Sequence, residues 1–404
     1  MRVVIIGAGP AGLTVAETLR NYDMDSEIVL YAAEPFPPYA PPAIVDYLVS
    51  GREETLFWKG KEFCDQLRID YRPGISIQAV ETDNHDVVEA NNRKVHYDTL
   101  VIATGSRLYA PIEGSDLPGI YNFKSLTAAR SLMEKVRQGQ LGSAVIVGAG
   151  FIGMEVSLLL RQLGLAVTII EMQDRVMPRV LDRETADMAL GTLKARGVEV
   201  RLDTKAVTFE GEREVEGVRL DSGEIVQGEV YVAASGVKPN TEFLNGSGID
   251  LGWGVVVDDY LRTSRGDVYA AGDVAETHDL LTGERYVHAI FPNAVAQGRI
   301  VAANIMGKET RYEGAESMNS LKHLGLPLVA VGHMHADEEL RFRCGNVLRK
   351  IFLKDGRIVG FRLTGDIRGA GVYRSLMLRR VDVAAYKDRL LSDRFGIADL
   401  MIPY

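Results

Sequence analysis

Short apolar runs rich in β-branched residues recur along the chain, each four or five residues long. Runs of this length and composition predict buried β-strands, at Val3–Ile6, Ile28–Tyr31, Leu100–Ala103, Ala144–Val147, Ala166–Ile170, Val230–Ala233 and Val268–Ala271. Helix-like stretches follow two of these strands, at Leu13–Leu19 and Met154–Leu163, and a third lies at Ala294–Ile305. The alternation of strand and helix predicts an α/β fold built from βαβ units.

Two glycine-rich turns, Gly7–Gly12 and Gly148–Gly153, each stand between a predicted strand and a predicted helix. Their wide separation in the sequence indicates two whole domains of one type rather than a short-period repeat. In such a turn the first glycine permits a tight bend, the second lets the backbone approach a phosphate, and the third lets helix and strand pack closely. The helix N-terminus behind the turn offers free N–H groups to a pyrophosphate. The pair therefore predicts two dinucleotide-binding domains, although similar glycine patterns also occur in turns that bind nothing.

An acidic residue follows each turn at the end of the next strand: Glu34 after the first turn and Glu171 after the second. Both follow the last glycine of their turn at the spacing of about 20 residues at which a carboxylate accepts hydrogen bonds from the adenosine ribose. A carboxylate at Glu171 would repel a 2′-phosphate, so NADH is favoured over NADPH, although Arg175 nearby weakens this preference.

The sequence pattern changes after about residue 312. Short strands are expected at Val347–Leu353 and Arg357–Leu363, on either side of the turn Lys354–Gly356. This pattern predicts a smaller α+β domain at the C-terminus. Near the N-terminus, the stretch Pro35–Pro42 is dense in proline and is expected to be a rigid, non-helical loop.

The charge is unevenly distributed over the 404 residues, whose formal net charge is −9. An acidic chain of this kind is not expected to bind nucleic acid. The segment from Arg341 to Arg380 nevertheless carries eleven Arg and Lys against two acids, so its charge is +9 and the remainder sums to −18. This basic segment could steer an acidic protein partner, bind acidic metabolites, or pair with acids of the chain itself or of a second subunit.

The two cysteines, Cys64 and Cys344, lie far apart in the sequence, and neither belongs to a CxxC pair. This usage excludes a disulfide framework and a local redox dithiol, and it fits a cytoplasmic location. Acidic neighbours should raise the pKa of Cys64, which is the wrong direction for a reactive thiolate. We expect no metal site, because His333 and His335 have no third ligand nearby, and no membrane span or signal peptide.

With these motifs in order, together with Ala103-Thr104-Gly105 and Ala271-Gly272-Asp273, the chain resembles the pyridine nucleotide-disulfide oxidoreductase family of flavoproteins. The resemblance implies two Rossmann-like domains, for FAD (residues 1–110 and 237–312) and for NAD (residues 111–236), plus a smaller α+β C-terminal domain (residues 313–404). It implies FAD contacts at Gly7, Gly9, Pro10, Ala11, Gly12, Glu34, Ala103, Thr104, Gly105, Gly272 and Asp273. It implies NAD contacts at Gly148, Gly150, Phe151, Ile152, Gly153, Glu171 and Gly236.

The resemblance also implies that Phe151 and Glu155 lie near the nicotinamide, where an aromatic ring often covers the flavin. Three plainer alternatives stay open. Phe151 could be a core residue, Glu155 could be a solvated acid in the first turn of its helix, and Asp273 could cap a following helix.

With this cysteine pattern the chain resembles the cysteine-free branch of the family, which includes ferredoxin and rubredoxin reductases and the flavin part of nitrite reductases. Where a peroxidase or coenzyme A disulfide reductase carries its cysteine, this chain has Pro41-Pro42-Ala43, and Pro10 replaces the histidine that the peroxidases carry. The lysine that the cysteine-free branch often places near its flavin is also absent, because Ile44-Val45-Asp46 stands there.

We therefore expect an oxidoreductase in which hydride passes between NAD(H) and FAD and single electrons pass between FAD and a ferredoxin-like or other iron–sulfur protein. The basic segment is the candidate docking surface, and the chain is expected to be a homodimer or a subunit of a larger complex. The alternatives are an NADH oxidase, a reductase of small disulfides such as coenzyme A disulfide, and a non-catalytic subunit that binds FAD and NADH.

Overall fold

The computed structural model describes residues 1–139, 141–321 and 323–400. The chain divides into two compact units, each assembled from three stretches of sequence. The first unit contains residues 1–109, 122–137 and 237–315, and the second contains residues 110–121, 138–236 and 316–404. The division into an FAD, an NAD and a C-terminal domain stays a prediction.

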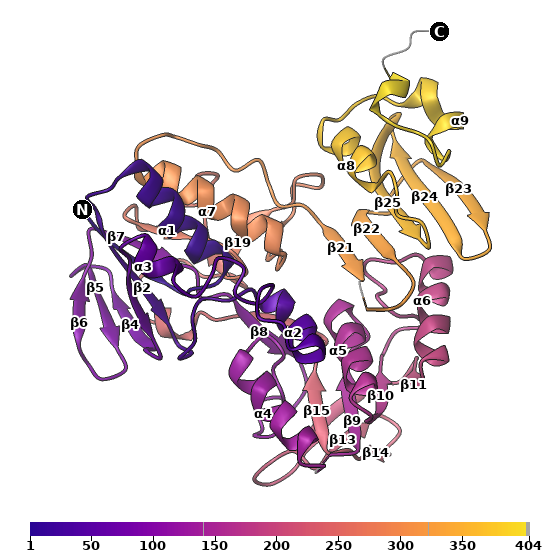
Figure 1. Cartoon of the computed structure of the whole chain (residues 1–404), viewed down its shortest axis with the longest axis horizontal. Helices are drawn as coiled ribbons and strands as arrows, with labels where there is room; N and C mark the ends of the chain where they lie inside the picture. The colour runs from indigo at the N-terminus through magenta and orange to yellow at the C-terminus, as the bar shows by residue number, and fades with distance from the viewer. Residues whose placement is uncertain (140, 322, 401–404) are drawn as a thin grey trace. The chain divides into compact units, whose positions relative to one another are not determined.

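The first unit is built on a parallel five-stranded sheet. Its strand order is β18 (Val268–Ala270), β7 (Thr99–Ile102), β1 (Arg2–Ile6), β2 (Glu27–Ala32) and β3 (Asp70–Pro73). The central strand β1 is almost wholly buried, because it pairs with a strand on each side and the helix that follows it packs on it. Helices α1 (Pro10–Tyr22) and α7 (Phe291–Ile305) lie side by side (Figure 1). Gly298 permits this contact, since a Cβ there would lie 2.7 Å from the carbonyl oxygen of Ala11.

Smaller elements complete the first unit. Its other helices are η1 (Pro41–Ala43), α2 (Ile44–Ser50), α3 (Phe63–Gln66), α4 (Leu126–Arg137) and η2 (Glu242–Leu244). Its small sheets are β4 (Ile77–Glu81), β5 (Asp86–Glu89) and β6 (Lys94–His96), and β17 (Val255–Val256), β19 (Ala275–His278) and β20 (Arg285–Tyr286). Strand β8 (Ser106–Tyr109) pairs with β16 (Gly236–Pro239), where the chain passes between the two units.

The second unit repeats the strand–turn–helix arrangement. Its parallel sheet has the order β11 (Val198–Arg201), β10 (Ala166–Ile170), β9 (Ser143–Val147) and β15 (Val230–Ala233). Helix α5 (Phe151–Gln162) packs on β9 and β10, and helix α6 (Arg183–Ala195) packs on β11. A small antiparallel sheet contains β12 (Ala206–Glu210), β13 (Gly217–Leu220) and β14 (Ile225–Val226).

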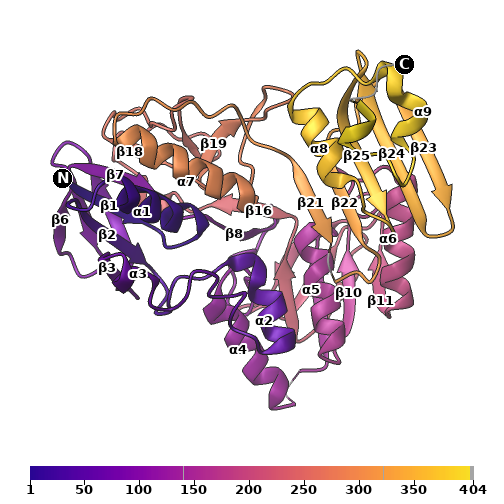
Figure 2. The same ribbon diagram turned by 45° about the horizontal axis from the view of Figure 1, so that its top comes forward.

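The C-terminal part of the second unit is an antiparallel five-stranded sheet (Figure 2). Its strand order is β21 (Met318–Leu321), β22 (Leu328–Gly332), β25 (Arg357–Thr364), β24 (Val347–Lys354) and β23 (Glu338–Cys344). Helix α8 (Ala370–Leu378) packs on β25, where the ring of Tyr373 meets that of Phe361. The short helices η3 (Ala384–Tyr386), α9 (Lys387–Leu390) and η4 (Ile397–Leu400) follow.

The α/β fold class predicted from the sequence is confirmed, and all nine predicted strands are present within a residue or two of their predicted ends. Two kinds of local expectation are wrong, the starts of the helices and the non-helical character of the whole proline-rich stretch. Helices α1, α5 and α7 each begin three residues before their predicted starts, at Pro10, Phe151 and Phe291. Pro41 and Pro42 open the 3₁₀ helix η1, because proline suits the first turn of a helix. Of the alternatives left open, the one in which Asp273 caps a following helix is excluded, since the strand β19 follows it. No helix among the described residues has the length and apolar character needed to cross a bilayer.

Candidate dinucleotide sites

The first glycine turn is held so tightly against its neighbours that its first and third residues can only be glycine. Gly7 has φ +112°, and a Cβ there would lie 2.1 Å from the carbonyl oxygen of Ala103 at the end of β7. A Cβ at Gly12 would lie 2.0 Å from the carbonyl oxygen of Gly7. Because the turn is this tight, α1 begins only a few residues after β1 ends, as the sequence motif predicts.

The middle of the same turn is open. Gly9 is the N-cap of α1 with an ordinary φ of −79°, and no side chain caps the helix there. A Cβ at Gly9 would meet no protein atom within 4 Å. Pro10 occupies the first turn, where its missing N–H costs nothing. The turn thus presents the N–H groups and positive end of a 13-residue helix to open space, which fits the pyrophosphate of a dinucleotide.

The carboxylate of Glu34, which follows β2, is fixed by a network that the sequence did not predict. Its Oε1 accepts hydrogen bonds from the Ser125 hydroxyl (2.9 Å), the Thr127 hydroxyl (2.6 Å) and the Thr127 N–H (2.8 Å). Its Oε2 accepts one from the Tyr39 hydroxyl. Burial raises the pKa of a carboxyl group, but the hydrogen bonds from Thr127 and Tyr39 outweigh it, and the net effect lowers the pKa of Glu34. The side chain is therefore an ionised acceptor at neutral pH.

Asp273 has a cationic partner that is equally absent from the sequence motifs. The Lys124 Nζ lies 2.5 Å from Asp273 Oδ2 and 2.5 Å from the Ser106 hydroxyl oxygen. The preceding Gly272 has φ +81° and donates its N–H to the side chain of the buried Gln297 (2.7 Å). The one segment that carries Lys124, Ser125 and Thr127 thus contacts both acids predicted for FAD.

The predicted crossing segment Ala103-Thr104-Gly105 follows β7. Ala103 is buried, and the Thr104 hydroxyl donates to the carbonyl oxygen of Asn240 (2.8 Å). The Asn240 amide donates back to the carbonyl oxygen of Thr104 (2.9 Å). Gly105 has φ +68° and open space at its Cβ position.

The second glycine turn reproduces the geometry of the first. Gly148 has φ +110°, and a Cβ there would lie 2.6 Å from the carbonyl oxygen of Ala234. A Cβ at Gly153 would lie 2.1 Å from the carbonyl oxygen of Gly148. Gly150 is the N-cap of α5 without a side-chain cap, and its Cβ position is 3.7 Å from the nearest protein atom. The uncapped N-terminus of the 12-residue helix α5 therefore also has room for a pyrophosphate.

Glu171, which directly follows β10, is hydrogen-bonded to the backbone of this second turn. It is 7% exposed, its Oε2 accepts the N–H of Ala149 (2.8 Å), and its Oε1 accepts the N–H of Gln173 (3.0 Å). Each carboxylate oxygen has a second lone pair, so both can accept a further hydrogen bond. Arg175, the residue that weakened the preference for NADH, donates to Asp174 (2.9 Å).

The remaining residues predicted for NAD lie on or near α5. Phe151 and Ile152 form its first turn and are half-buried, and Glu155 follows one turn later. Gly236 is exposed at the start of β16, with open space at its Cβ position.

The two cysteines form no disulfide, and their surroundings differ. Cys64 is buried on α3, and burial, with a further contribution from the charge of Asp65, raises the pKa of its thiol to about 12. Cys344 is exposed at the end of β23, and both thiols are free. Across the described part of the chain, no three His, Cys, Asp or Glu side chains are arranged to hold a metal ion.

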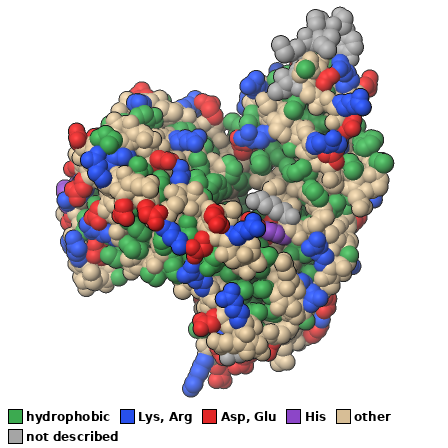
Figure 3. Space-filling model, viewed as in Figure 1, with side chains coloured by type: hydrophobic (Ala, Val, Ile, Leu, Met, Phe, Trp, Pro, Cys, Tyr) green, Lys and Arg blue, Asp and Glu red, His purple; other side chains and the backbone are tan. Residues whose placement is uncertain are grey.

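Most of the basic segment is engaged by the second unit's own groups. Glu184 pairs with Arg341, Arg343 and Lys350. Asp366 pairs with Arg349 and Arg368, and Glu316 pairs with Arg374. On the face drawn in Figure 3, positive and negative side chains are interspersed. These pairs favour the intrachain alternative for most of the segment, and the exposed side chains of Lys354, Arg357 and Arg379 lie outside them.

Comparison with known proteins matches residues 1–298 to the pyridine nucleotide-disulphide oxidoreductase family. The NADH oxidase of Methanocaldococcus jannaschii is 29% identical over 398 residues, covering 92% of this chain and 89% of that protein. The rubredoxin-NAD(+) reductase of Pseudomonas putida is 33% identical over 314 residues, covering 77% and 81%. The crystal structure of the ferredoxin reductase for the CYP199A2 system from Rhodopseudomonas palustris superposes with a TM-score of 0.88 at 25% identity, covering 99% of this chain and all of that one. The chain therefore belongs to the pyridine nucleotide-disulphide oxidoreductase family and is an NAD(P)H-dependent flavoprotein oxidoreductase that uses FAD and NAD(H).

Proposed function

We propose that the chain is an NADH-dependent reductase that passes electrons from FAD to an iron–sulfur protein without a redox-active cysteine. The observation that carries the proposal is the combination of two open helix N-termini with two cysteines that form no dithiol pair. Gly9 and Gly150 leave room for two pyrophosphates, whereas Cys64 is buried with a raised pKa and has no cysteine partner.

In this proposal the first turn holds FAD. The N–H groups behind Gly9 and Pro10 bind the pyrophosphate. Glu34 accepts a hydrogen bond from the adenosine ribose at Oε2, which accepts only the Tyr39 hydroxyl within the chain, whereas Oε1 is filled by Ser125 and Thr127. Asp273, which is ion-paired with Lys124, accepts hydrogen bonds from hydroxyl groups in the flavin half of FAD. Bound FAD supplies the chemistry, because it exchanges a hydride with a nicotinamide and exchanges electrons singly with a metal centre.

The second turn holds NAD(H) in the same way. The N–H groups behind Gly150 bind its pyrophosphate, and the remaining acceptor capacity of Glu171 takes the ribose hydroxyls. A carboxylate in that position disfavours a 2′-phosphate, and Arg175 is already engaged by Asp174, so NADH is the preferred donor. Phe151 and Glu155 are proposed to line the nicotinamide side.

The acceptor is proposed from relatives whose names specify one, namely a ferredoxin reductase and a rubredoxin reductase. Because most cations of the basic segment are hydrogen-bonded or ion-paired within the chain, we assign docking to exposed cations such as Lys354, Arg357 and Arg379. Exposed cations of this kind accelerate association with an acidic partner more than they strengthen binding.

An anaerobic titration tests the proposal. The purified holoprotein is mixed with NADH while the flavin absorbance is followed, and an acidic ferredoxin is then added in excess. We expect stoichiometric loss of the flavin absorbance, followed by its return as the ferredoxin is reduced. A flavin that NADH does not bleach would instead support a non-catalytic subunit.

A second function, NADH oxidase, is favoured by the relative from Methanocaldococcus jannaschii. It predicts that air alone reoxidises the flavin as fast as ferredoxin does. Reduction of coenzyme A disulfide is disfavoured, since it needs a nucleophilic thiolate. Oligomeric state, membership of a larger complex and cytoplasmic location stay predictions.

A further inference from the structure

Three cationic residues stand in one row across the C-terminal sheet. Lys350 on β24 is directly opposite Arg341 on β23 and Arg362 on β25. Lys350 is 6% exposed and Arg362 is 1% exposed. Like charges directly opposite each other destabilise a sheet, and burying a charge costs free energy unless it is paired. The row therefore requires a compensating structure.

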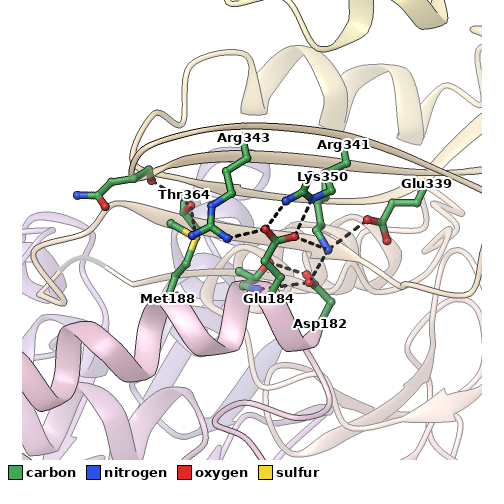
Figure 4. Close-up of polar contacts among 10 residues, drawn as sticks. Asp182, Glu184, Met188, Glu339, Arg341, Arg343, Lys350 and Thr364 are labelled. Carbon is green, nitrogen blue, oxygen red and sulfur yellow. Dashed lines mark hydrogen bonds and ion pairs between the residues drawn. The ribbon is translucent and has the colours of Figure 1, made fainter.

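The N-terminal end of α6 provides that compensation (Figure 4). The Lys350 Nζ lies 2.7 Å from Asp182, 3.2 Å from Glu184 and 3.1 Å from Glu339. Arg341 donates to both carboxylate oxygens of Glu184 (2.8 and 2.7 Å). Asp182 is also the N-cap of α6, where its side chain accepts the N–H of Thr185. One carboxylate therefore both starts the helix and binds the sheet.

Arg362 reaches the backbone just before this helix. Its Nε donates to the carbonyl oxygen of Val180 (2.5 Å), and its other nitrogens donate to carbonyl oxygens of Val331, Phe361 and Gly332. Burial lowers the pKa of Arg362 to about 10, which still leaves it charged at neutral pH, and Asp182 opposes this lowering. The guanidinium is thus a fixed four-way donor within the second unit.

Residues 171–182, here called the nucleotide loop, connect the end of β10 to α6. A continuous series of hydrogen bonds runs from Arg362 along this loop to the glycine turn. The Val180 N–H donates to the carbonyl oxygen of Met177 (2.9 Å), and the Met177 N–H donates to that of Ala149 (2.9 Å). The Ala149 N–H donates to the carboxylate of Glu171 (2.8 Å). The loop is therefore anchored at one end by the glycine turn and at the other by the C-terminal sheet.

We infer that Lys350 and Arg362 are positioning residues for the dinucleotide, and that they set its affinity without touching it. The inference rests on the proposed function, in which the second turn and Glu171 hold NAD(H). When either cation is removed, the far end of the loop loses one of its two anchors, Asp182 or the Val180 carbonyl, while the glycine turn stays intact. The ribose-binding carboxylate is then less well ordered, and the adenosine half of the nucleotide binds more weakly.

The test measures affinity and rate separately in the holoenzyme. Binding of ADP-ribose is measured by calorimetry, and stopped-flow bleaching of the flavin by NADH gives the limiting rate at saturation. For Lys350→Met we expect the Kd of ADP-ribose to rise about tenfold, while the limiting rate stays within about twofold. Lys350→Arg should restore binding.

Arg349→Met is the matched control. Arg349 is the neighbour of Lys350 on β24 and is 2% exposed, but it bonds instead to Asp366 (2.6 Å) and to the carbonyl oxygen of Leu391 (3.0 Å). It should lose stability while its Kd for ADP-ribose stays within about twofold of the wild type. Arg362→Met removes a fully buried group and could prevent folding, so Asp182→Asn is the second test. It should raise the Kd of ADP-ribose as Lys350→Met does.

The outcomes separate the inference from the proposed function. If the wild type binds neither ADP-ribose nor NADH, the proposed function fails. If the wild type binds both, but Lys350→Met and Asp182→Asn bind ADP-ribose as tightly as Arg349→Met, the positioning role is wrong. A limiting rate that falls in parallel with affinity would also overturn it, because it would indicate a general loss of structure.

Discussion

A single methyl group at Gly9 tests whether the first turn is built for a ligand. The Cβ of an alanine there meets no protein atom within 4 Å, and φ is −79°, so Gly9→Ala should fold without strain. If a pyrophosphate approaches this turn, the methyl group lies in its path. Oxygens of the phosphate must then retreat by several tenths of an ångström, which lengthens N–H···O bonds from about 2.9 Å to beyond about 3.2 Å.

The expected magnitude follows from the weakening of charge-assisted hydrogen bonds. Such a bond contributes about 1.5–3 kcal/mol, so losing most of one bond weakens FAD binding by at least roughly tenfold, since about 1.4 kcal/mol corresponds to a factor of ten. Gly12→Ala should behave differently. Its Cβ would lie 2.0 Å from the backbone oxygen of Gly7, so it should destabilise the protein itself.

The assay compares FAD affinity of the apoprotein, by fluorescence quenching of the flavin, with thermal unfolding without FAD. Gly191→Ala, on α6, is the control, because it adds a methyl group that also meets nothing within 4 Å, at a site remote in sequence from the turn. We expect Gly9→Ala to keep the apoprotein unfolding temperature of the wild type and to lose FAD affinity. If Gly9→Ala binds FAD as tightly as Gly191→Ala does, no pyrophosphate approaches this turn and the reasoning is refuted.

Three further predictions address the thiols, the acid beside FAD and the ion network. In the double variant Cys64→Ala, Cys344→Ser, the stopped-flow rate at which NADH bleaches the flavin should stay within about twofold of the wild type. A loss of bleaching would indicate that a thiol takes part in the reaction. Glu34→Gln should weaken FAD binding by about tenfold, as measured by retained flavin after dialysis, because an amide accepts ribose hydroxyls less strongly than an ionised carboxylate; full retention would remove Glu34 from the site. Hydrogen bonds from Arg341 and neighbouring cations hold the pKa of Glu184 well below its usual range; a lowered folded-state pKa contributes stability above the unfolded value of about 4.3, and that stability is lost as pH falls below it. Urea midpoints should therefore drop between about pH 5 and pH 3 in the wild type and drop less in Glu184→Gln, and parallel curves would contradict this assignment.

The sequence by itself determined the local machinery of the fold. Each glycine turn, its preceding strand and its following helix lie within a few consecutive residues, and their signals are local: branched apolar runs, glycines where a Cβ would overlap the backbone, and helical periodicity. The predicted acids Glu34 and Glu171 do lie just after β2 and β10. Even the cysteine argument was local, since the charge of Asp65 adjoins Cys64 in the chain, although burial is the larger cause of the raised pKa.

Only the tertiary structure decided which distant residues meet these sites. Lys124 contacts Asp273 across 149 residues of sequence, and Lys350 contacts Asp182 across 168. No periodicity or spacing encodes such pairs, because they depend on how sheets and helices pack after the chain has folded. For the same reason the basic segment could be counted from the sequence, but whether its cations face solvent or the chain's own carboxylates was set by the register of β23, β24 and β25 against α6.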